Sequence, residues 1–329
     1  MAGMIGRLLA VVLAVAPLGA QVKLTQAPDR ISVDINGKAF TEFFMGPEAP
    51  KPYLHPLRAA SGVIVTRHFP MEKVEGEAID HPHHRGLWFS HGDVNGIDFW
   101  MNEPPAGRTN LGRIVLNKVL EVKSGDKSGS LAALFDWVGP DKKTLLTESR
   151  TMVFYADSKL RTMDFDITLT AIEKAKFGDT KEGSFAIRVA SGLEVAARNV
   201  PDTPVRTGKM LDSEGRESEA SVWGKRAGWV DVYGEVEGQK VGIAIMDHPA
   251  NPHYPTFWHC RAYGLCAANI FGARDFMNDK TQDMSITLAP GEKLRLRYRV
   301  VIHPDDPKTA GVAALYKAWA ATTEPRIIQ

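Results

Sequence analysis

The chain has little cysteine, little net charge and few long apolar runs. Its 329 residues include two cysteines, which excludes a small fold held together by many disulfides. Forty basic residues face thirty-nine acidic ones, and a formal charge of +1 gives no broad electrostatic reason to expect nucleic acid or an anionic membrane as partner. The 44% content of hydrophobic residues is enough for a substantial core. We therefore expect a self-supporting globular protein that does not bind nucleic acid.

The longest apolar run lies at the N-terminus. Arg7 precedes an apolar stretch over residues 8–18, and Gly19-Ala20 precede Gln21. This is the layout of a secretory signal, and the run is shorter than the roughly 20 apolar residues that a membrane span needs. We predict a signal peptide over residues 1–20, a single domain over residues 21–329, and a secreted or periplasmic protein without a membrane span. An uncleaved anchor is the alternative.

The two cysteines, Cys260 and Cys266, are six positions apart, and their pairing is open. In one straight strand they would be roughly 20 Å apart, which is beyond the reach of a disulfide. A bridge therefore requires a turn at Tyr263-Gly264. Two buried free thiols agree equally well with the sequence.

Short segments of alternating polarity dominate the chain. Residues 30–35 and 39–44 flank Asn36-Gly37, and this dipeptide between two extended runs is a strong signal for a β-hairpin. Residues 160–169 alternate apolar and polar side chains, as in a half-exposed antiparallel strand. Further strands are expected at 62–70, 184–190, 228–233, 242–246, 285–288 and 294–302.

Helical periodicity is confined to residues 309–321, where Val312, Leu315, Tyr316 and Trp319 form one apolar stripe. Many short strands with almost no helix favour an all-β fold over alternating strands and helices. We predict a large antiparallel β-sandwich with a short C-terminal helix.

Residues 80–100 form the densest polar stretch of the chain and contain four of its ten histidines. Ionisable and amide groups packed among aromatic residues are costly to desolvate unless they bond one another or a ligand. We interpret the stretch as the floor of a polar binding site. Its candidate residues are His81, His83, His84, Arg85, His91, Asp93, Asn95 and Trp100.

Three later clusters, at residues 181–188, 222–229 and 247–261, also place charged or amide groups beside aromatic residues. This combination suits a sugar, because the hydroxyls take hydrogen bonds while the C–H faces lie on rings. We expect all four clusters to line one cleft that takes a small carbohydrate. The added candidates are Glu182, Arg188, Lys225, Arg226, Asp247, His248, Asn251, His259 and Arg261.

Acid–base chemistry on a sugar needs a proton donor and a carboxylate that faces it. The candidates for the acid are His84, His91 and His248, and those for the base are Glu182 and Asp247. A non-catalytic sugar-binding protein is the second hypothesis.

A metal site is the third hypothesis. His81, His83 and His84 offer closely spaced imidazoles, and His91, Asp93 or His248 could complete the ligand set. Such a site would bind a divalent metal and would serve a metal-dependent oxygenase or hydrolase.

Four ordered motifs carry a resemblance to a known family. They are residues 81–96 (HPHHRGLWFSHGDVNG), Glu182-Gly-Ser-Phe, Trp223-Gly-Lys-Arg-Ala, and Asp247-His-Pro with Trp258-His259 and Tyr263-Gly264. Together they resemble the secreted bacterial proteins labelled "methane oxygenase PmoA" family, over most of the chain after residue 20. The resemblance implies a β-supersandwich similar to galactose mutarotase-like proteins. The Asn-rich loop and downstream Glu of aldose epimerases have no counterpart here, so epimerase activity is not implied.

Overall fold

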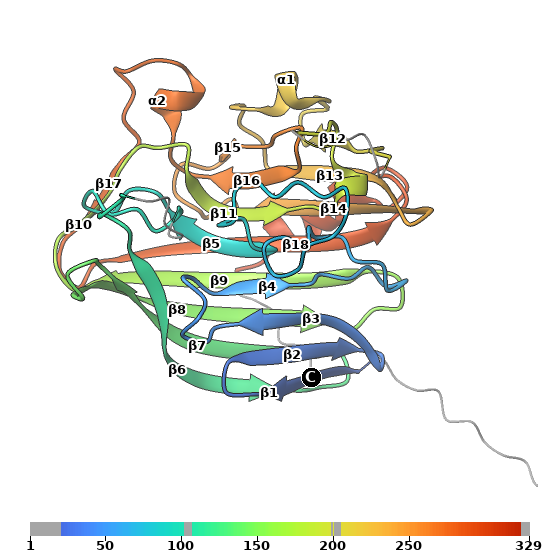
Figure 1. Cartoon of the computed structure of the whole chain (residues 1–329), viewed down its shortest axis with the longest axis horizontal. Helices are drawn as coiled ribbons and strands as arrows, with labels where there is room; N and C mark the ends of the chain where they lie inside the picture. The colour runs from blue at the N-terminus through green and yellow to red at the C-terminus, as the bar shows by residue number, and fades with distance from the viewer. Residues whose placement is uncertain (1–20, 102–106, 199, 201–204, 324–329) are drawn as a thin grey trace, which may run out of the picture.

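Two eight-stranded antiparallel sheets form the framework of the molecule (Figure 1). The computed structural model describes residues 21–101, 107–198, 200 and 205–323, so the predicted signal sequence lies outside the described residues. Within the described residues, no helix combines the length and the apolarity that a membrane crossing would require.

The first sheet takes its strands from both ends of the sequence. In spatial order they are β1 (Val22–Gln26), β2 (Arg30–Ile35), β3 (Lys38–Phe44), β4 (Tyr53–His55), β5 (Leu87–His91), β11 (Gly183–Arg188), β16 (Leu265–Asn269) and β15 (Phe257–Trp258). The predicted hairpin is confirmed, with Asn36 and Gly37 at positive φ between β2 and β3.

The second sheet contains the longer strands. In spatial order they are β12 (Lys209–Asp212), β13 (Trp229–Val236), β14 (Gln239–Asp247), β18 (Lys293–Pro304), β9 (Arg161–Ala171), β8 (Thr144–Tyr155), β7 (Ser128–Val138) and β6 (Arg113–Lys123). A small separate sheet pairs β10 (Ala175–Phe177) with β17 (Ile286–Leu288).

Strand alternation buries one face of each sheet against the other. In β9 the apolar side chains of Met163, Phe165, Ile167 and Leu169 enter the same core as Phe89 of the first sheet. The antiparallel sandwich predicted from alternation is therefore confirmed. The expected strand at residues 62–70 is wrong, because this segment makes only isolated bridges, such as Thr66 to Val189.

Helix is scarce, as predicted. The terminal helix α3 (Val312–Ala320) packs Val312 and Trp319 on the outer face of the second sheet. Two four-residue helices, α1 (Glu219–Val222) and α2 (Ala273–Phe276), lie beyond β15 at the top of Figure 1. A 3₁₀ turn, η1, covers Ser191–Leu193.

Cys260 and Cys266 form a disulfide. Gly264 adopts positive φ and donates a backbone hydrogen bond to the Arg261 carbonyl oxygen (2.9 Å), which closes the turn between β15 and β16. The bridge and the turn that it requires therefore occur together.

Candidate functional site on the outer face of the first sheet

The centre of the first sheet presents small side chains on its outer face. In the β5–β11 register Trp88 lies opposite Ala186, and Ser90 lies opposite Ser184. Leu87, Phe89 and Phe185 point the other way into the main core, because successive side chains of a strand alternate between faces. The small side chains leave room on this face for the loop between β4 and β5.

Arg67 fixes that loop. Its guanidinium group is fully buried and makes six hydrogen bonds: to the carbonyl oxygens of residues 69, 78, 80, 81 and 84, at 2.8 to 3.3 Å, and to Asp80 Oδ1 at 2.8 Å. The guanidinium group thus satisfies carbonyl groups that have no sheet partner. Sequence analysis did not single out Arg67, since it precedes the histidine-rich stretch and belongs to no motif.

The loop adds two rings, His81 and His84, to a column of four on the sheet. His81 stacks on Tyr263 on one side (centroids 5.4 Å apart, 7° between planes) and on His84 on the other (4.7 Å, 8°). His84 in turn stacks on Trp88 (5.2 Å, 21°). We call Tyr263, His81, His84 and Trp88 the ring stack. Two further rings meet His84 edge-on, His83 at 4.4 Å and Trp100 at 5.9 Å.

Guanidinium groups surround the ring stack. Arg188 of β11 is fully buried, lies 4.7 Å from the Tyr263 ring centroid and donates to Asp80 Oδ1 (3.1 Å). Arg198 lies 4.6 Å from the same centroid and 3.6 Å from Asp80 Oδ2. Burial would raise the pKa of Asp80, but His81, Arg188 and Arg67 outweigh it and hold this pKa well below its usual value.

The buried histidines of the site are held neutral. Burial, with Lys51 and His81 next in effect, lowers the pKa of His83 to about 2. Burial, His83 and Arg188 lower the pKa of His84 well below its usual value. Arg188 Nη1 lies 3.4 Å from His84 Nδ1, so Nδ1 accepts and Nε2 carries the proton. The geometry therefore suits His84 to hydrogen bonding and opposes the role of general acid that we expected for it.

Glu182 is a partly exposed carboxyl group whose pKa is raised. Its side chain is 34% exposed, its pKa is raised by burial and by Asp98, and Lys181 Nζ lies 3.7 Å away. Together with burial, its charge also helps to raise the pKa of Tyr263, the last ring of the ring stack. A raised carboxyl pKa favours the protonated form, which suits a proton donor better than the base that the sequence predicts for Glu182.

The turn between β15 and β16 adds the predicted residues His259 and Arg261. His259 is buried, its Nδ1 lies 3.1 Å from the Lys181 carbonyl oxygen, and burial lowers its pKa to about 4. Arg261 pairs with Glu219 (2.9 Å) and lies 5.9 Å from the ring centroids of both Trp223 and Tyr263. Arg261 therefore connects the ring stack to the aromatic residues near α1.

Two further cations, Lys51 and Arg85, lie against aromatic rings near the ring stack. Lys51 is fully buried, donates to the Trp100 carbonyl oxygen (2.5 Å) and lies 5.6 Å from the Trp88 ring centroid. Arg85 is half-buried and lies 5.6 Å from the Tyr53 ring centroid. Arg85 was predicted for the site, whereas Lys51 stands in a proline-rich loop that gave no sign of burial.

Several buried polar atoms of this face have no hydrogen-bond partner among the described residues. Buried donors and acceptors in folded proteins usually have a partner, so a group of orphans on one face is typical of a site that binds a polar ligand. The atoms are Trp88 Nε1, Trp100 Nε1, Ser90 Oγ, Ser184 Oγ and Arg188 Nε.

Three residues of the histidine-rich stretch lie elsewhere. His91 follows Ser90 and so points into the core, 4.3 Å from the Phe271 ring centroid, where burial lowers its pKa to about 4. Asp93 accepts from the Gly96 amide (2.8 Å), and Asn95 bonds the backbone of residues 174 and 176. His91 is thus a core residue, and Asp93 and Asn95 are turn residues. The prediction that these three residues line the site is therefore wrong.

The cluster at residues 247–251 belongs to the second sheet. Asp247 is buried and accepts from Asn251 Nδ2 (2.7 Å), and Asn251 in turn bonds the backbone of Arg297, so the pair fixes a loop against β18. Burial raises the pKa of Asp247 to about 7. His248 faces α3, with Trp319 at 4.9 Å. These three residues do not join the ring stack.

Lys225 and Arg226 also lie apart from the ring stack. Both are exposed, and Arg226 donates to the carbonyl oxygens of Pro255 (2.7 Å) and His253 (2.6 Å) beside Phe257 at the edge of the first sheet. The prediction that all four clusters line one cleft is thus wrong for residues 222–229 and 247–251. The clusters at residues 80–100 and 181–188 meet, and His259 and Arg261 lie beside them.

The described residues include no group of three or more His, Cys, Asp or Glu side chains that could hold a metal ion. His81 stacks on His84 with centroids 4.7 Å apart, and His83 meets these two rings edge-on at 5.6 and 4.4 Å. Stacked rings turn their nitrogen atoms to the sides, which is not the convergent arrangement of a metal site. The proposed triad of metal ligands is therefore not supported.

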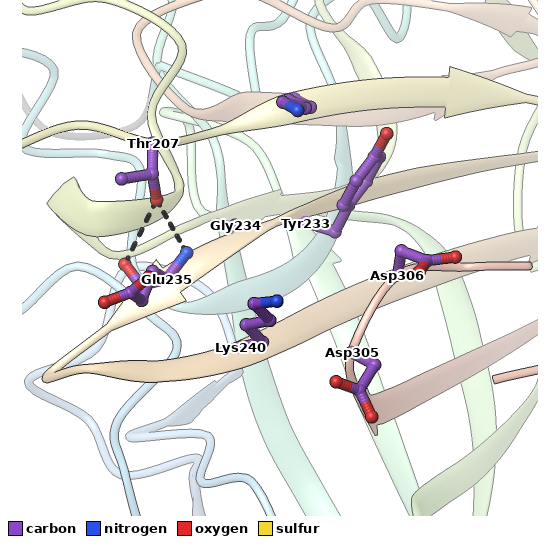
Figure 2. Close-up of a pocket in the computed structure, with 8 residues that line it drawn as sticks. Thr207, Tyr233, Gly234, Glu235, Lys240, Asp305 and Asp306 are labelled. Carbon is purple, nitrogen blue, oxygen red and sulfur yellow. Dashed lines mark hydrogen bonds between the residues drawn. The ribbon is translucent and has the colours of Figure 1, made fainter. Parts of the chain in front are cut away.

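A hollow of about 290 Å³ lies at the far edge of the second sheet (Figure 2). Its polar lining already serves the fold: Thr207 Oγ1 accepts from the Glu235 amide (2.6 Å), and Asp306 accepts from the amides of Lys308 and Thr309 ahead of α3 (2.9 and 3.0 Å). The outer face of the first sheet is therefore the stronger candidate site.

A family model described as a family of unknown function, DUF6807, matches residues 30–317. A search of curated proteins found no match. The resemblance to the "methane oxygenase PmoA" proteins stays a prediction.

Similar solved structures are remote in sequence. They include a GH36 α-galactosidase from Geobacillus stearothermophilus (10% identity, TM-score 0.41, 87% of this chain and 41% of that one). A putative aldose 1-epimerase from Escherichia coli K12 is 12% identical (TM-score 0.31, 87% and 100% covered). A galactose mutarotase-like protein from Clostridium acetobutylicum is 10% identical (TM-score 0.39, 87% and 99% covered). The chain thus spans about two-fifths of the α-galactosidase, and the site's chemistry is argued from its own residues.

Proposed function

The chain belongs to the DUF6807 family of unknown function, and we propose that it binds a carbohydrate on the outer face of the first sheet and transfers a proton to it through Glu182. The observation that carries the proposal is the ring stack, whose rings lie beside buried hydrogen-bonding groups without partners. Sugars need both features, because their C–H faces pack on rings and their hydroxyl groups replace lost hydrogen bonds with water.

The partly exposed groups of this face mark the side from which a ligand arrives. Side-chain exposure is 20% for Asp80, 26% for His81, 34% for Glu182 and 42% for Arg198, whereas His84 and Arg188 lie beneath them. Asp80 is ionised and can accept hydrogen bonds from hydroxyl groups. Neutral His84 can support a ligand without contributing charge.

Glu182 supplies the acid–base chemistry in this proposal. A carboxyl group whose pKa is raised by burial remains partly protonated closer to neutral pH and can protonate a ring or glycosidic oxygen. Isomerisation and bond cleavage both begin with such a step. A binding protein without catalysis would use the same face and would not depend on the proton of Glu182.

The experiment is a screen of the purified protein against monosaccharides and glycosides, with binding followed by calorimetry and turnover by NMR. We expect at least one saccharide to bind. Glu182→Gln should lower turnover by about 100-fold or more while the affinity changes far less. His248→Gln is the matched control, because His248 is a buried histidine on the second sheet.

Two results would overturn the proposal. One is the absence of binding across the panel. The other is an equal loss of function in Glu182→Gln and His248→Gln. Full turnover in Glu182→Gln with binding intact would leave a carbohydrate site but would remove the role of Glu182.

We also infer that the protein acts outside the cytoplasm. The disulfide between Cys260 and Cys266 supports this location, because such bonds persist in oxidising compartments. The predicted signal peptide over residues 1–20 points the same way. Detection of the protein in a periplasmic or culture-medium fraction, with the first twenty residues removed, would test the location.

A further inference from the structure

We propose that the ligand of this face is an acidic carbohydrate, whose carboxylate or sulfate group binds the guanidinium groups at the exposed end of the ring stack. The inference rests on the proposed function and names its substrate class. A neutral sugar would need the rings and hydroxyl partners but not the cations.

The first observation is an excess of positive charge. Asp80 is shared by three guanidinium groups, those of Arg67 (2.8 Å), Arg188 (3.1 Å) and Arg198 (3.6 Å). The next carboxylate, Glu194, lies 3.6 Å from Arg188 but 2.8 Å from another arginine, Arg206. Among the described residues, the two carboxylates Asp80 and Glu194 thus face four guanidinium groups, and positive charge is in local excess.

Nearby carboxylates do not cancel this excess. Glu182 has Lys181 at 3.7 Å, and Glu219 has Arg261 at 2.9 Å. Glu77, which affects the charge of Arg67, pairs with His68 at 2.9 Å and accepts from two backbone amides. Each of these carboxylates therefore has a basic partner of its own among the described residues.

The second observation is the position of the cations. The guanidinium carbons of Arg198, Arg188 and Arg261 lie 4.6, 4.7 and 5.9 Å from the Tyr263 ring centroid. Arg198 and Arg261 are 42% and 36% exposed, so a ligand that reaches this ring meets them directly. Arg188 is fully buried, and its Nε has no partner among the described residues.

This arrangement fits a planar or tetrahedral oxyanion. Guanidinium groups bind carboxylate and sulfate oxygens through paired hydrogen bonds, which are stronger than those between neutral groups. A uronic acid and a sulfated sugar both present such oxyanions next to hydroxyl groups and an apolar ring face. The shared chemistry is therefore an oxyanion attached to a sugar ring.

The experiment compares matched pairs of ligands by calorimetry. One arm uses a uronic-acid oligosaccharide and its carboxyl-reduced form, and the other a sulfated oligosaccharide and its desulfated form. We expect the acidic member of one pair to bind at least about tenfold more tightly than its neutral partner. Its affinity should fall as NaCl is raised, because ions screen the guanidinium groups.

Arg198→Gln provides the test by mutation. It should reduce the ratio of acidic to neutral affinity several-fold. Arg295→Gln is the matched control, since Arg295 has a similar exposure of 44% but pairs with Asp166 on the second sheet. The control should leave the ratio unchanged.

The outcomes separate this inference from the proposed function. If neutral oligosaccharides bind as tightly as acidic ones, or if Arg198→Gln leaves the ratio intact, the acidic class is wrong while a carbohydrate site remains. If no saccharide of either kind binds, both the class and the proposed function are wrong.

Discussion

The outer faces of the two sheets both carry charged residues, but they are organised differently. On the second sheet two carboxylates each face one basic side chain: Asp164 receives two hydrogen bonds from Arg299 (2.6 and 2.8 Å), and Asp231 lies 2.7 Å from His303. On the first sheet Asp80 is shared by three guanidinium groups, and buried indole and hydroxyl groups lack partners among the described residues. Paired charges stabilise a fold, whereas unbalanced charges and polar groups without partners are typical of a ligand-binding surface.

The largest expected effect comes from replacing Arg67, whose hydrogen bonds fix the loop on the outer face of the first sheet. Arg67→Met deletes six hydrogen bonds and leaves Asp80 with fewer cations, so we expect the free energy of unfolding to fall by about 3–5 kcal/mol. Urea denaturation at pH 7 measures the change. Arg295→Met on the second sheet removes an exposed ion pair and should cost at most about 1 kcal/mol.

Arg67→Lys separates charge from geometry. Lysine keeps the positive charge but cannot reach the six acceptors that the planar guanidinium group serves. It should therefore be clearly less stable than the native protein. Equal losses for Arg67→Met and Arg295→Met would mean that the two faces do not differ as described.

A second expected effect concerns pH, and it contrasts Asp247 with Asp80. Burial raises the pKa of Asp247 to about 7, so its ionisation favours the unfolded state. The stability that this group contributes is present below about pH 4 and is lost as pH rises to about 7, by up to about 4 kcal/mol. Asp247→Asn should remove this part of the slope, measured by urea denaturation between pH 4 and 7.

Asp80 is the control, because its ionisation changes the stability of the fold with the opposite sign. Its pKa is held well below the usual value, so its contribution to stability is present above about pH 4 and is lost as pH falls. Asp80→Asn should therefore flatten the acid side of the profile. A change of the same sign in both variants would contradict the contrast between an isolated buried carboxyl group and one surrounded by cations.

The sequence predicted the framework of the fold better than the membership of the site. Alternation and the Asn36-Gly37 turn were sufficient for the sandwich and its first hairpin, because both are local signals. The prediction of the site residues is wrong where one step along a strand moves a side chain to the other face of the sheet. Ser90 points outward while His91 enters the core, and membership of a polar cluster does not reveal this difference.

Other residues were missed because their roles depend on contacts distant in the sequence. Arg67 and Lys51 belong to no motif, and only the folded loop brings them to the ring stack. Tyr263 belongs to a predicted turn and to a family motif but not to the candidate site residues, although it ends the ring stack. His81, His84 and Arg188 lie together, because they stand on β11 and on the loop that Arg67 fixes, and their role in binding stays a prediction.

The smallest expected effect tests whether the disulfide stabilises only the outer face of the first sheet. Cys260 and Cys266 enclose a short segment that carries Arg261 and Tyr263, so the bridge limits the motion of the exposed end of the ring stack. The Cys260→Ser/Cys266→Ser variant should lose about 2 kcal/mol of stability, as expected for a short closed loop. It should also bind the saccharide ligand more weakly, because Arg261 and Tyr263 must then be ordered on binding. Calorimetry compares the saccharide affinity of this variant with that of Asp166→Asn, which alters only the second sheet. Unchanged affinity in the cysteine variant would show that the turn keeps its shape without the disulfide.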